Sequence, residues 1–548
     1  MCDTTDLLYD VAVVGFGPSG AVAAALLGAQ GLKTFVCDRT LEVYDKPRAF
    51  ALDHEIVRVF QQIGIEKQVL QFAEAFTPSE FFGVDGQLIK RFTTVDPPYP
   101  LGYVPSLVFS QPAVERVLRD HVQRQPRVDV ALGCELTDLT CSDDSVTLSL
   151  KKNDGARRQI RSRYVLACDG ASSKVRGKVG IELQDLGFDQ PWLVVDVRVN
   201  AKGVAKLPKT SVQYCEPQRP CTFLIGTGDH RRWEISLNPG EDPQQMATPD
   251  ATWKLLSRWL TPEDGVLWRQ ASYRFHALVA ERWRVDRIFV AGDAAHQQPP
   301  FLGQGMCQGI RDVANFSWKV GAVLRGEAAD NLLDSYGAER KAHVTELTTR
   351  IKGIGQLVGE RDLDKAQTRD AQLLATCGGI VKSVPRQDVQ PFLDTGLLSA
   401  RASSARGSIF PQPRIVQGEQ KLLLDRLTGY GWRLVLGGGF TGDPLQLEKD
   451  LAGVAGRADE LKLVTVKIAS TPKASWLCEA DGVVAGWFKH HACVAALVRP
   501  DHYVFGTAVA MPEIQKLVHE AAGDVAHHGA NLAASCRQSG QSTSVETT

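Results

Sequence analysis

A glycine-rich turn close to the start of the chain constrains its fold more than any other feature. Residues 9–14 form an apolar run that predicts a strand, residues 15–20 read Gly-Phe-Gly-Pro-Ser-Gly, and the alanine-rich stretch 21–27 predicts a helix. A second apolar strand is predicted at 34–37, and Asp38 follows it. Glycines in such a turn admit a pyrophosphate close to the backbone, and an acid after the second strand accepts hydrogen bonds from ribose hydroxyls. The context therefore predicts a bound dinucleotide, with a glycine turn that serves packing alone as the alternative.

Two later helix starts carry polar residues that suit such a ligand. Arg48 lies shortly after the predicted ribose acid, before a helix predicted over 55–63. Ser110 and Gln111 begin another predicted helix, which Ser110 is placed to cap. A lone arginine is more often a solvated surface charge, and a glutamine at a helix start is more often a simple cap. The acid after the second strand suits NAD and FAD alike, so these residues leave the choice between them open.

At two further positions a predicted strand ends next to an aspartate and a glycine. The apolar run 163–168 leads to Asp169, and the run 288–291 leads to Asp293. A Pro- and Gly-rich loop follows Asp293, and then a helix is predicted over 306–324. An aspartate in such a place accepts hydrogen bonds from hydroxyls, and the free N–H groups of a helix start favour an anion. An ordinary strand–loop–helix connection is the alternative.

The rest of the chain divides by pattern and composition. Alternating apolar residues between 186 and 284 predict an antiparallel sheet. Pro and Ser become frequent after Lys382, which predicts a linker over 386–425. Within 426–515, predicted strands alternate with a helix predicted over 445–457, and the remaining residues, 516–548, are rich in Ala, Ser, Gly, Thr and His, which predicts a mobile tail.

Composition bounds the class of protein. With 548 residues the chain is too long for one core, so two or three domains are expected. A net charge of −1 gives no general attraction to nucleic acid or membrane. No signal peptide or membrane span is expected. The twelve cysteines form no Cys-x-x-Cys, which favours reduced thiols in the cytoplasm over disulfides or a metal site.

Five motifs occur along the chain in a characteristic order. They are Gly-x-Gly-x-x-Gly, Pro-Arg-Ala before a helix, Gln-Pro, Asp-Gly-Ala-x-Ser-x-Val-Arg, and Ala-Gly-Asp-Ala-Ala-His-x-x-Pro-Pro-Phe-x-Gly-Gln-Gly. In this order, over roughly residues 8–510, the chain resembles the class A (single-component) FAD-dependent aromatic hydroxylases, the para-hydroxybenzoate and phenol hydroxylase family. The motif set is specific for the family and less specific for one substrate.

The resemblance implies an α/β fold with three parts. A Rossmann-like FAD-binding domain over 1–185 and 285–385 is interleaved with an antiparallel β-sheet substrate domain over 186–284, and the C-terminal domain over 426–515 is thioredoxin-like. Since that last domain has no Cys-x-x-Cys, a structural or dimer-contact role is expected for it, and a homodimer is left open.

The family pattern also assigns cofactor contacts. The glycine turn would hold the FAD pyrophosphate, Asp38 the adenosine ribose and Asp293 the ribityl chain, while the loop from residue 299 to 306 would lie along the isoalloxazine ring. Asp169 matches a motif associated with both FAD and the nicotinamide donor. The complete set of cofactor-binding residues implied in this way is Gly15, Gly17, Gly20, Asp38, Arg39, Arg48, Gln111, Asp169, Asp293, Pro300, Gly303, Gln304, Gly305 and Met306.

The activity implied is that of a flavin monooxygenase. NADH or NADPH reduces FAD, O2 then yields a flavin C4a-hydroperoxide, and an OH group is transferred ortho to a phenol hydroxyl. The first expected substrate is 3-(3-hydroxyphenyl)propionate, in aromatic catabolism, with NADH favoured as donor. Candidate catalytic residues are His296, Pro300, Tyr214 and His276, and Arg219 and Tyr273 are further substrate-facing candidates. For each of these residues a structural role is the alternative.

Other substrates and other functions are also compatible with the sequence. The substrate could be a resorcinol-like or polycyclic phenol. A flavoprotein of the same fold could perform oxidation, reduction or halogenation, although the chain has no Trp-x-Trp-x-Ile motif of a halogenase. A partner-binding protein without catalysis is disfavoured by the intact Gly-Gln-Gly loop.

Overall fold

The computed structural model describes residues 3–453 and 461–527. They divide into two compact units, one formed by Met1–Ala314 with Val344–Pro391 and the other by Asn315–His343 with Phe392–Thr548. Helices α9 (Gly305–Leu324) and α10 (Asp334–Val358) each contribute residues to both units. None of the helices in the described ranges is long and apolar enough to cross a membrane.

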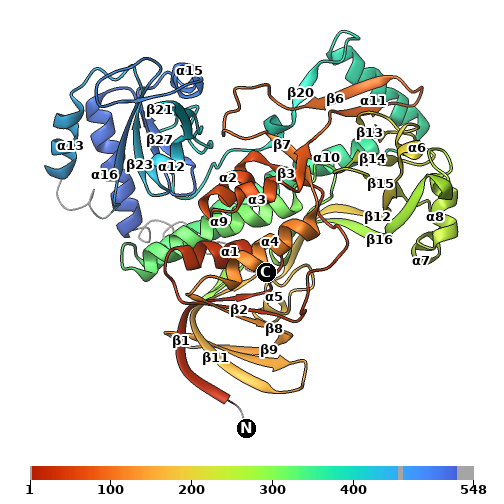
Figure 1. Ribbon diagram of the computed structural model, residues 1–548, viewed down its shortest axis with the longest axis horizontal. Helices are drawn as coiled ribbons and strands as arrows, with labels where there is room; N and C mark the ends of the chain where they lie inside the picture. The colour runs from red at the N-terminus through yellow and green to blue at the C-terminus, as the bar shows by residue number, and fades with distance from the viewer. Residues whose placement is uncertain (1–2, 454–460, 528–548) are drawn as a thin grey trace, which may run out of the picture. The chain divides into compact units, whose positions relative to one another are not determined.

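The first unit contains a parallel sheet built on the N-terminal strand. Its strands pair in the order β17-β18-β11-β1-β2-β8, and β9 and β10 extend it as an antiparallel hairpin. The strands are β1 (Asp3–Val14), β2 (Thr34–Asp38), β8 (Val128–Leu132), β9 (Cys134–Cys141), β10 (Val146–Lys152), β11 (Arg157–Ala167), β17 (Arg284–Val285) and β18 (Ile288–Val290). Residues 11–14 of β1 are buried, as expected for a strand covered on both faces. Helices α1 (Pro18–Ala29) and α4 (Gln111–Gln123) lie together beside this sheet (Figure 1).

A nine-stranded mixed sheet is the second layer of this unit. Its order is β19-β16-β12-β15-β14-β13-β5-β6-β20. The strands are β5 (Ser79–Phe82), β6 (Leu88–Thr93), β12 (Leu183–Val199), β13 (Ser211–Tyr214), β14 (Cys221–Ile225), β15 (His230–Ser236), β16 (Gly265–Ala280), β19 (His296–Gln297) and β20 (Ser383–Pro385). The expected sheet over 186–284 therefore exists, and β5, β6 and β20 join it from outside that range.

Shorter elements complete the first unit. A small sheet has the order β3-β7-β4, from Ala51–Asp53, Ser106–Phe109 and Ala73–Ala75. The remaining helices are α2 (His54–Gln62), α3 (Glu66–Leu70), α5 (Lys174–Lys178), α6 (Ala201–Val204), α7 (Pro243–Met246), α8 (Pro249–Leu256) and α11 (Leu363–Thr376).

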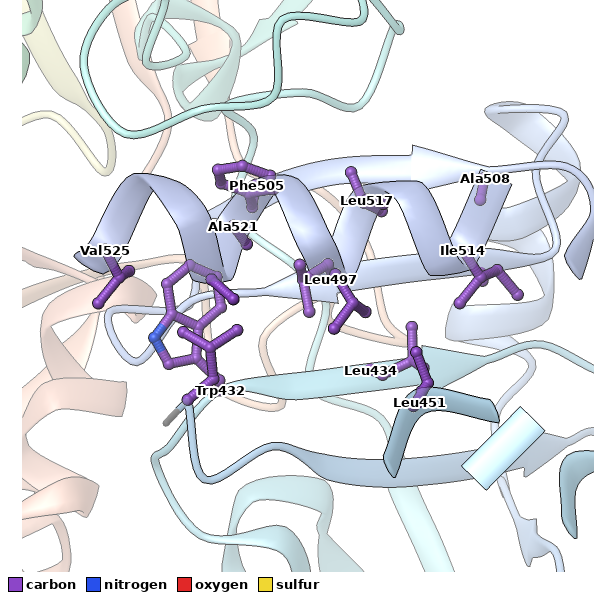
Figure 2. Close-up of a cluster of buried hydrophobic side chains, with 14 of the residues drawn as sticks. Trp432, Leu434, Leu451, Leu497, Phe505, Ala508, Ile514, Leu517, Ala521 and Val525 are labelled. Carbon is purple, nitrogen blue, oxygen red and sulfur yellow. The ribbon is translucent and has the colours of Figure 1, made fainter. Parts of the chain in front are cut away.

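The main sheet of the second unit has the order β25-β24-β23-β26-β27, in which β23 is parallel to β24 and antiparallel to β26. Its elements are the hairpin β21 (Arg414–Gln417) and β22 (Gln420–Leu423), α12 (Leu424–Thr428), β23 (Arg433–Leu436), α13 (Pro444–Gly453), β24 (Val464–Ala469), β25 (Leu477–Cys478), α15 (Val483–His490), β26 (Ala495–Val498), β27 (Val504–Ala508) and α16 (Met511–His527). Figure 2 shows α16 lying over the strands, with Leu517, Ala521 and Val525 turned toward Trp432 and Leu497.

Two expectations about this region differ from the structure. The segment expected to be a linker over 386–425 contains a hairpin, and Ala405, Phe410 and Ile415 are buried in the core of the second unit. The tail expected from residue 516 begins inside α16, because its apolar residues recur every three or four positions and pack on the sheet. The expected helix over 445–457 ends at Gly453 within the described residues, and 454–460 and 528–548 lie outside them.

Candidate functional site

A cavity of about 880 Å³ lies within the first unit. Its walls are the glycine turn after β1, the ends of β2, β11 and β18, the loop that precedes α9, and one face of the nine-stranded sheet. The carboxyl ends of parallel strands meet here, which is where open α/β sheets bind ligands.

The three glycines of the turn are required for three different reasons. Gly15 has a φ of +101°, and a Cβ there would lie 2.3 Å from the carbonyl oxygen of Cys168. A Cβ on Gly20 would lie 2.0 Å from the Gly15 oxygen, so this glycine permits close packing and does not itself line the cavity. No atom lies within 4 Å of a Cβ on Gly17. The open space in front of Gly17, at the start of α1, fits a pyrophosphate.

Asp38 and Arg39 line the adjoining wall. The Asp38 carboxylate accepts hydrogen bonds from the backbone N–H of Phe16 at 2.7 Å and of Thr40 at 2.8 Å. Oδ1 also accepts a hydrogen bond from the Thr40 hydroxyl at 2.7 Å, whereas Oδ2 accepts the Phe16 bond and keeps a second lone pair for a ribose hydroxyl.

Gln111 contributes to the site through the Arg48 segment. Its Oε1 accepts hydrogen bonds from the N–H of Arg48 at 2.8 Å and of Ala49 at 2.6 Å. Both Arg48 and Gln111 line the cavity. Ser110 occupies the N-cap position of α4 but makes no side-chain capping bond, so the expected cap is wrong.

Two arginines of the sheet hold the same segment from the other side. Arg232 donates to the carbonyl oxygens of Arg48 at 3.0 Å and Pro47 at 2.9 Å, and Arg269 also donates to Pro47. Arg232 is paired with the buried carboxylate of Asp196 at 2.7 Å. The sequence assigned no role to these arginines, because their contacts with Pro47 join segments 185 and 222 positions apart.

The acids expected after β11 and β18 both line the cavity. Asp169 accepts hydrogen bonds from the Ser173 hydroxyl at 2.5 Å and the Val175 N–H at 3.1 Å, and burial raises its pKa. Asp293 is open to the cavity, yet it lies deep enough for desolvation to raise its pKa as well. Both side chains suit hydrogen bonds with hydroxyls of a ligand.

His296 lines the cavity, but its ring is buried and one ring nitrogen is engaged. Its Nε2 lies 2.7 Å from Oδ2 of Asp312, which also accepts a hydrogen bond from the N–H of Gly292, and the ring stacks on Trp283. The side chain is 1 % exposed. This arrangement favours the structural role for His296, since the imidazole is committed to holding the turn next to Asp293.

The loop expected along the isoalloxazine ring lines the cavity at Pro300, Gly303, Gly305 and Met306. Gln304 differs, because its side chain turns into the protein, where Oε1 accepts hydrogen bonds from Arg311 at 3.0 Å and Gln390 at 2.7 Å.

The substrate-facing candidates separate into two groups. Tyr273 and His276 line the cavity, with the Tyr273 hydroxyl bound by Arg269 and the His276 Nδ1 lying 3.5 Å from Asp189. Tyr214 is outside the cavity lining, on the opposite side of the sheet from its neighbour Gln213, and its hydroxyl accepts a hydrogen bond from Trp259 at 3.1 Å. Arg219 is also outside the lining, in an ion pair with Glu241 at 2.6 Å. The positions of Tyr214 and Arg219 argue against direct contact with a ligand in this cavity.

A polar row on the sheet was missed by the sequence analysis. Gln213, Thr222 and Glu234 pair across β13, β14 and β15, and all three line the cavity. The Thr222 hydroxyl donates to Gln213 at 2.5 Å, and the buried Oε2 of Glu234 has no hydrogen-bond partner among the described residues. Burial raises the pKa of Glu234 to about 7, and Arg232 moderates the rise. The alternation of Arg232, Glu234 and Ser236 with apolar residues in the sequence is the signal that identifies this face.

These residues together fit FAD. The space in front of Gly17 accommodates a pyrophosphate, Asp38 and Asp293 supply acceptors at two separate strand ends, and the start of α9 directs N–H groups into the cavity wall. The nine-stranded sheet leaves additional wall for a second, smaller ligand.

Comparisons with known proteins agree with this geometry. The family model FAD binding domain matches residues 8–351, and the model HcaD C-terminal domain matches residues 407–522. A probable NADH-specific resorcinol 4-hydroxylase of Rhodococcus jostii (strain RHA1) is 36% identical over 94% of this chain and 95% of its own length. A 3-(3-hydroxy-phenyl)propionate/3-hydroxycinnamic acid hydroxylase of Burkholderia cenocepacia (strain HI2424) is 30% identical over 90% of this chain and 93% of its own.

Solved structures share the fold at lower identity. The flavin-dependent monooxygenase PieE, in complex with FAD and substrate, has a TM-score of 0.77 and 20% identity, covering 94% of this chain and 99% of its own. Aklavinone-11 hydroxylase, with FAD and aklavinone, has a TM-score of 0.76 and 22% identity, covering 95% of this chain and 100% of its own.

Proposed function

Because the chain belongs to the FAD binding domain family and is a flavin-dependent aromatic hydroxylase, we propose that its substrate is a small neutral phenol with a second hydroxyl in the meta position, of the resorcinol type. The expected substrate, 3-(3-hydroxyphenyl)propionate, is also a meta-substituted phenol and is the second candidate. The reaction consumes NADH and O2 and adds one oxygen atom to the ring, with water as the second product. When bound, FAD would supply the hydride-accepting and O2-activating chemistry that the protein's own side chains lack.

One observation carries the choice of a neutral substrate. The cavity wall formed by the sheet presents Gln213, Thr222 and the unpaired buried carboxyl of Glu234. A carboxyl oxygen is an acceptor for a hydroxyl donor, whereas a substrate carboxylate beside it would meet like charge in a poorly solvated site. The higher identity to the protein named as a resorcinol hydroxylase, 36% against 30%, supports the same choice.

Two of the arginines that line the cavity, Arg232 and Arg386, do not offset that preference. Arg232 is engaged by Asp196 and by two backbone carbonyls. Arg386 donates to the Leu302 carbonyl at 2.9 Å and the Ser79 hydroxyl at 3.3 Å. Both guanidinium groups are therefore committed to holding loops, which leaves little pairing capacity for a carboxylate side chain.

We propose the following roles for the cofactor site. Gly15 and Gly17 would hold the pyrophosphate, Asp38 would bind the adenosine ribose, and Asp293 would bind the ribityl chain. Arg39, Arg48, Asp169 and the loop from Pro300 to Met306 form the remaining walls, with Gln111 positioning the Arg48 segment. The start of α9 would stabilise negative charge on the isoalloxazine edge. We also propose that the reaction takes place in the cytoplasm, where NADH is available, and that the second unit is thioredoxin-like with a structural role, which its strand order supports.

The test is aerobic NADH oxidation by FAD-loaded protein with resorcinol, with 3-(3-hydroxyphenyl)propionate, and without a phenol. NADH oxidation, H2O2 and hydroxylated product are measured together. Product matching NADH consumed with resorcinol supports the proposal, and coupled turnover with the phenylpropionate alone moves the assignment to that substrate. Stimulation that yields only H2O2 with both compounds contradicts both candidates, because an open or misfitted cavity releases peroxide.

A further inference from the structure

We infer that Glu234 contacts the reacting hydroxyl of the bound phenol and accepts its proton during oxygen transfer. The inference rests on the proposed function and names the general base for that reaction. It begins from an acid that the structure buries in a cavity wall without a hydrogen-bond donor.

Glu234 is directed into the cavity by strand register. In the nine-stranded sheet, residues opposite one another share a face, and the row through Glu234 runs from Gln213 and Thr222 to Val194. All four line the cavity. The side chain of Glu234 is 3 % exposed, and its Oε2 has no hydrogen-bond donor among the described residues. A buried carboxyl oxygen without a donor is costly, so a donor from a ligand would satisfy it.

The rows of residues on either side of the Glu234 row contact the loop that precedes α9, so the Glu234 row lies beside this loop. On one side, Phe301 of the loop packs against Trp192, two residues before Val194 on β12, with ring centroids 5.4 Å apart. On the other side, Arg386 bridges the Leu302 carbonyl to the hydroxyl of Ser79. Ser79 belongs to the row of Arg232, two residues before Glu234 on β15.

The loop thus contacts the sheet on both sides of the row that carries Glu234. The loop is also the segment proposed to lie along the flavin ring. A planar phenol held between the loop and the sheet would therefore meet Glu234 and Thr222 on its sheet side.

Other candidate bases near this wall already have partners. His296 is bound to Asp312, and the Tyr273 hydroxyl is bound by Arg269. Asp196 accepts hydrogen bonds from Arg232 and lies 2.7 Å from the His230 ring nitrogen. His276 faces Asp189. Glu234 is the acid of this sheet face whose structure leaves an oxygen without a donor.

Glu234 takes the phenol proton as oxygen is transferred to the ring. The O–H bond of the phenol breaks, its proton forms a bond to Oε2 of Glu234, and the electron pair moves through the phenol oxygen into the ring. The ortho carbon forms a bond to one oxygen atom of O2 as the O–O bond breaks, and the second oxygen atom leaves as water with the two electrons of the NADH hydride, which FAD would relay. The ring then loses its ortho hydrogen as a proton and regains aromaticity, and Glu234 returns its proton to solvent in the next cycle. A hydroxyl with an ordinary pKa of about 10 is protonated at neutral pH, so a base in contact with it raises the nucleophilicity of the ring.

The surroundings of Glu234 set the pH at which it can act. Burial raises its pKa to about 7, Arg232 on its own strand and Arg269 of β16 lower it, and Asp196 of β12 raises it. Gln213 and Thr222, which face it from β13 and β14, carry no charge. Glu234 is therefore ionised, and able to accept a proton, above about pH 7. Hydroxylation by the wild type should rise with pH through that value.

The first experiment compares Glu234→Gln and Glu234→Asp with the wild type across pH 5.5 to 9. Glu216→Gln is the matched control, since Glu216 pairs with Arg258 and is outside the cavity lining. We expect Glu234→Gln to lower the rate of product formation about 100-fold, within the range of general-base catalysis, and to remove the rising limb near pH 7. Glu234→Asp should restore part of the rate together with the limb. A Glu234→Gln protein that keeps both the rate and the limb overturns the inference.

A second experiment does not depend on turnover. Binding of 4-nitrophenolate, an ionised phenol with visible absorbance, is measured at pH 8 by calorimetry in two buffers of different ionisation enthalpy. A phenolate and a carboxylate in contact share a proton, so the wild type and Glu216→Gln should take up about one proton per ligand. Glu234→Gln should take up none. Equal uptake by wild type and Glu234→Gln, or no binding of the ligand by wild type, overturns the inference.

The two experiments separate the proposals. Proton uptake that depends on Glu234, in a protein that hydroxylates neither resorcinol nor the phenylpropionate, keeps the base and rejects the proposed substrates. Coupled hydroxylation by a Glu234→Gln protein keeps the proposed function and rejects the base.

Discussion

The Nε2 atom of His296 lies 2.7 Å from Oδ2 of Asp312, and the same oxygen accepts a hydrogen bond from the backbone of Gly292. One carboxylate thus fixes both ends of the short turn that carries Asp293. The arrangement favours the structural role for His296 over the catalytic role, both of which the sequence analysis had left open.

A His296→Gln variant tests this distinction. Glutamine keeps a donor near the position of Nε2 but takes up no proton, so FAD affinity and the pH dependence of hydroxylation should stay close to those of the wild type, with rates within about tenfold. The measurement is product formation across pH 5.5 to 9 with saturating FAD. Disappearance of the rising limb in this variant would assign the base to His296 instead.

Alanine substitutions at Gly15 and Gly17 should differ in their effects on apoprotein stability and on FAD affinity. Gly15→Ala places a Cβ against the Cys168 carbonyl in a left-handed conformation and should destabilise the apoprotein by about 2 kcal/mol or more. Gly17→Ala meets no protein atom within 4 Å, so the apoprotein should unfold at the wild-type temperature while FAD affinity falls at least tenfold. Thermal unfolding without FAD and fluorescence titration with FAD give the two readings. Equal apoprotein stability for both variants would contradict the assigned roles.

Arg232→Lys should weaken FAD binding although Arg232 belongs to the substrate sheet. Lysine cannot bond simultaneously to Asp196 and to the carbonyls of Pro47 and Arg48, so the Arg48 segment loses its support from this side. A tenfold or larger increase in the FAD dissociation constant is expected. Arg258→Lys, at a half-exposed pair with Glu216 outside the cavity, is the control and should leave the constant unchanged.

Glu234→Gln should stabilise the apoprotein at high pH. The folded-state pKa of about 7 is above the ordinary value of 4.5, so the folded protein holds a proton that the unfolded chain releases, and stability falls as pH rises between these values. At 1.36 kcal/mol per unit the penalty reaches about 3 kcal/mol above pH 7 and about 1 kcal/mol at pH 5.5. The gain in unfolding temperature of the variant should therefore be larger at pH 8 than at pH 5.5. A gain that is independent of pH would show that Glu234 is not held with a raised pKa.

In the second unit, Glu339 is fully buried between Arg499 and Lys319, at 2.7 and 2.8 Å. Burial alone would raise the pKa of Glu339, but the two cations outweigh it and hold the value at about 2. The pair therefore stabilises the fold above about pH 4.5, and this stability is lost as pH falls toward 2. Arg499 also pairs with the buried Asp501 at 2.7 Å, so Arg499→Met leaves two buried carboxylates with Lys319 as their remaining cation, and should cost about 3–5 kcal/mol at neutral pH.

Hydrogen exchange of the β26 and β27 amides measures this cost locally. Lys462→Met, which breaks the exposed pair with Glu327, should change it by less than about 1 kcal/mol. Comparable effects from the two variants would show that burial does not distinguish the two ion pairs.

The sequence predicted those parts of the site whose geometry is local. The turn at Gly15 and Gly17, and the acids Asp169 and Asp293, depend on a few consecutive residues whose backbone preferences are visible in the chain. The contacts that the sequence did not predict, including those made by the predicted residue Gln111, depend on strand register and on long-range packing. Gln111 binds a backbone segment 62 positions away, and Arg232 pairs with Asp196 across 36 positions.

Glu234 lies between these cases. Its strand was predicted, and alternation along that strand puts it on the face of Arg232. The sequence did not predict which face of β15 lines the cavity, because that depends on how β12, β13 and β14 pair with one another and with β15. The α16 helix was missed for a related reason, since its composition resembles a tail while its apolar spacing resembles a helix.

The two rows of the sheet face have a practical consequence for directed evolution. Substitutions in the row of Arg232, Asp196 and Arg269 would be scored in a screen as colourless, cofactor-poor protein, whatever their effect on substrate choice. Variation at Gln213, Thr222 and Val194 would instead alter the shape offered to the aromatic ring while the cofactor stays bound. A library confined to that second row would change which substrates are accepted while the protein still binds its cofactor.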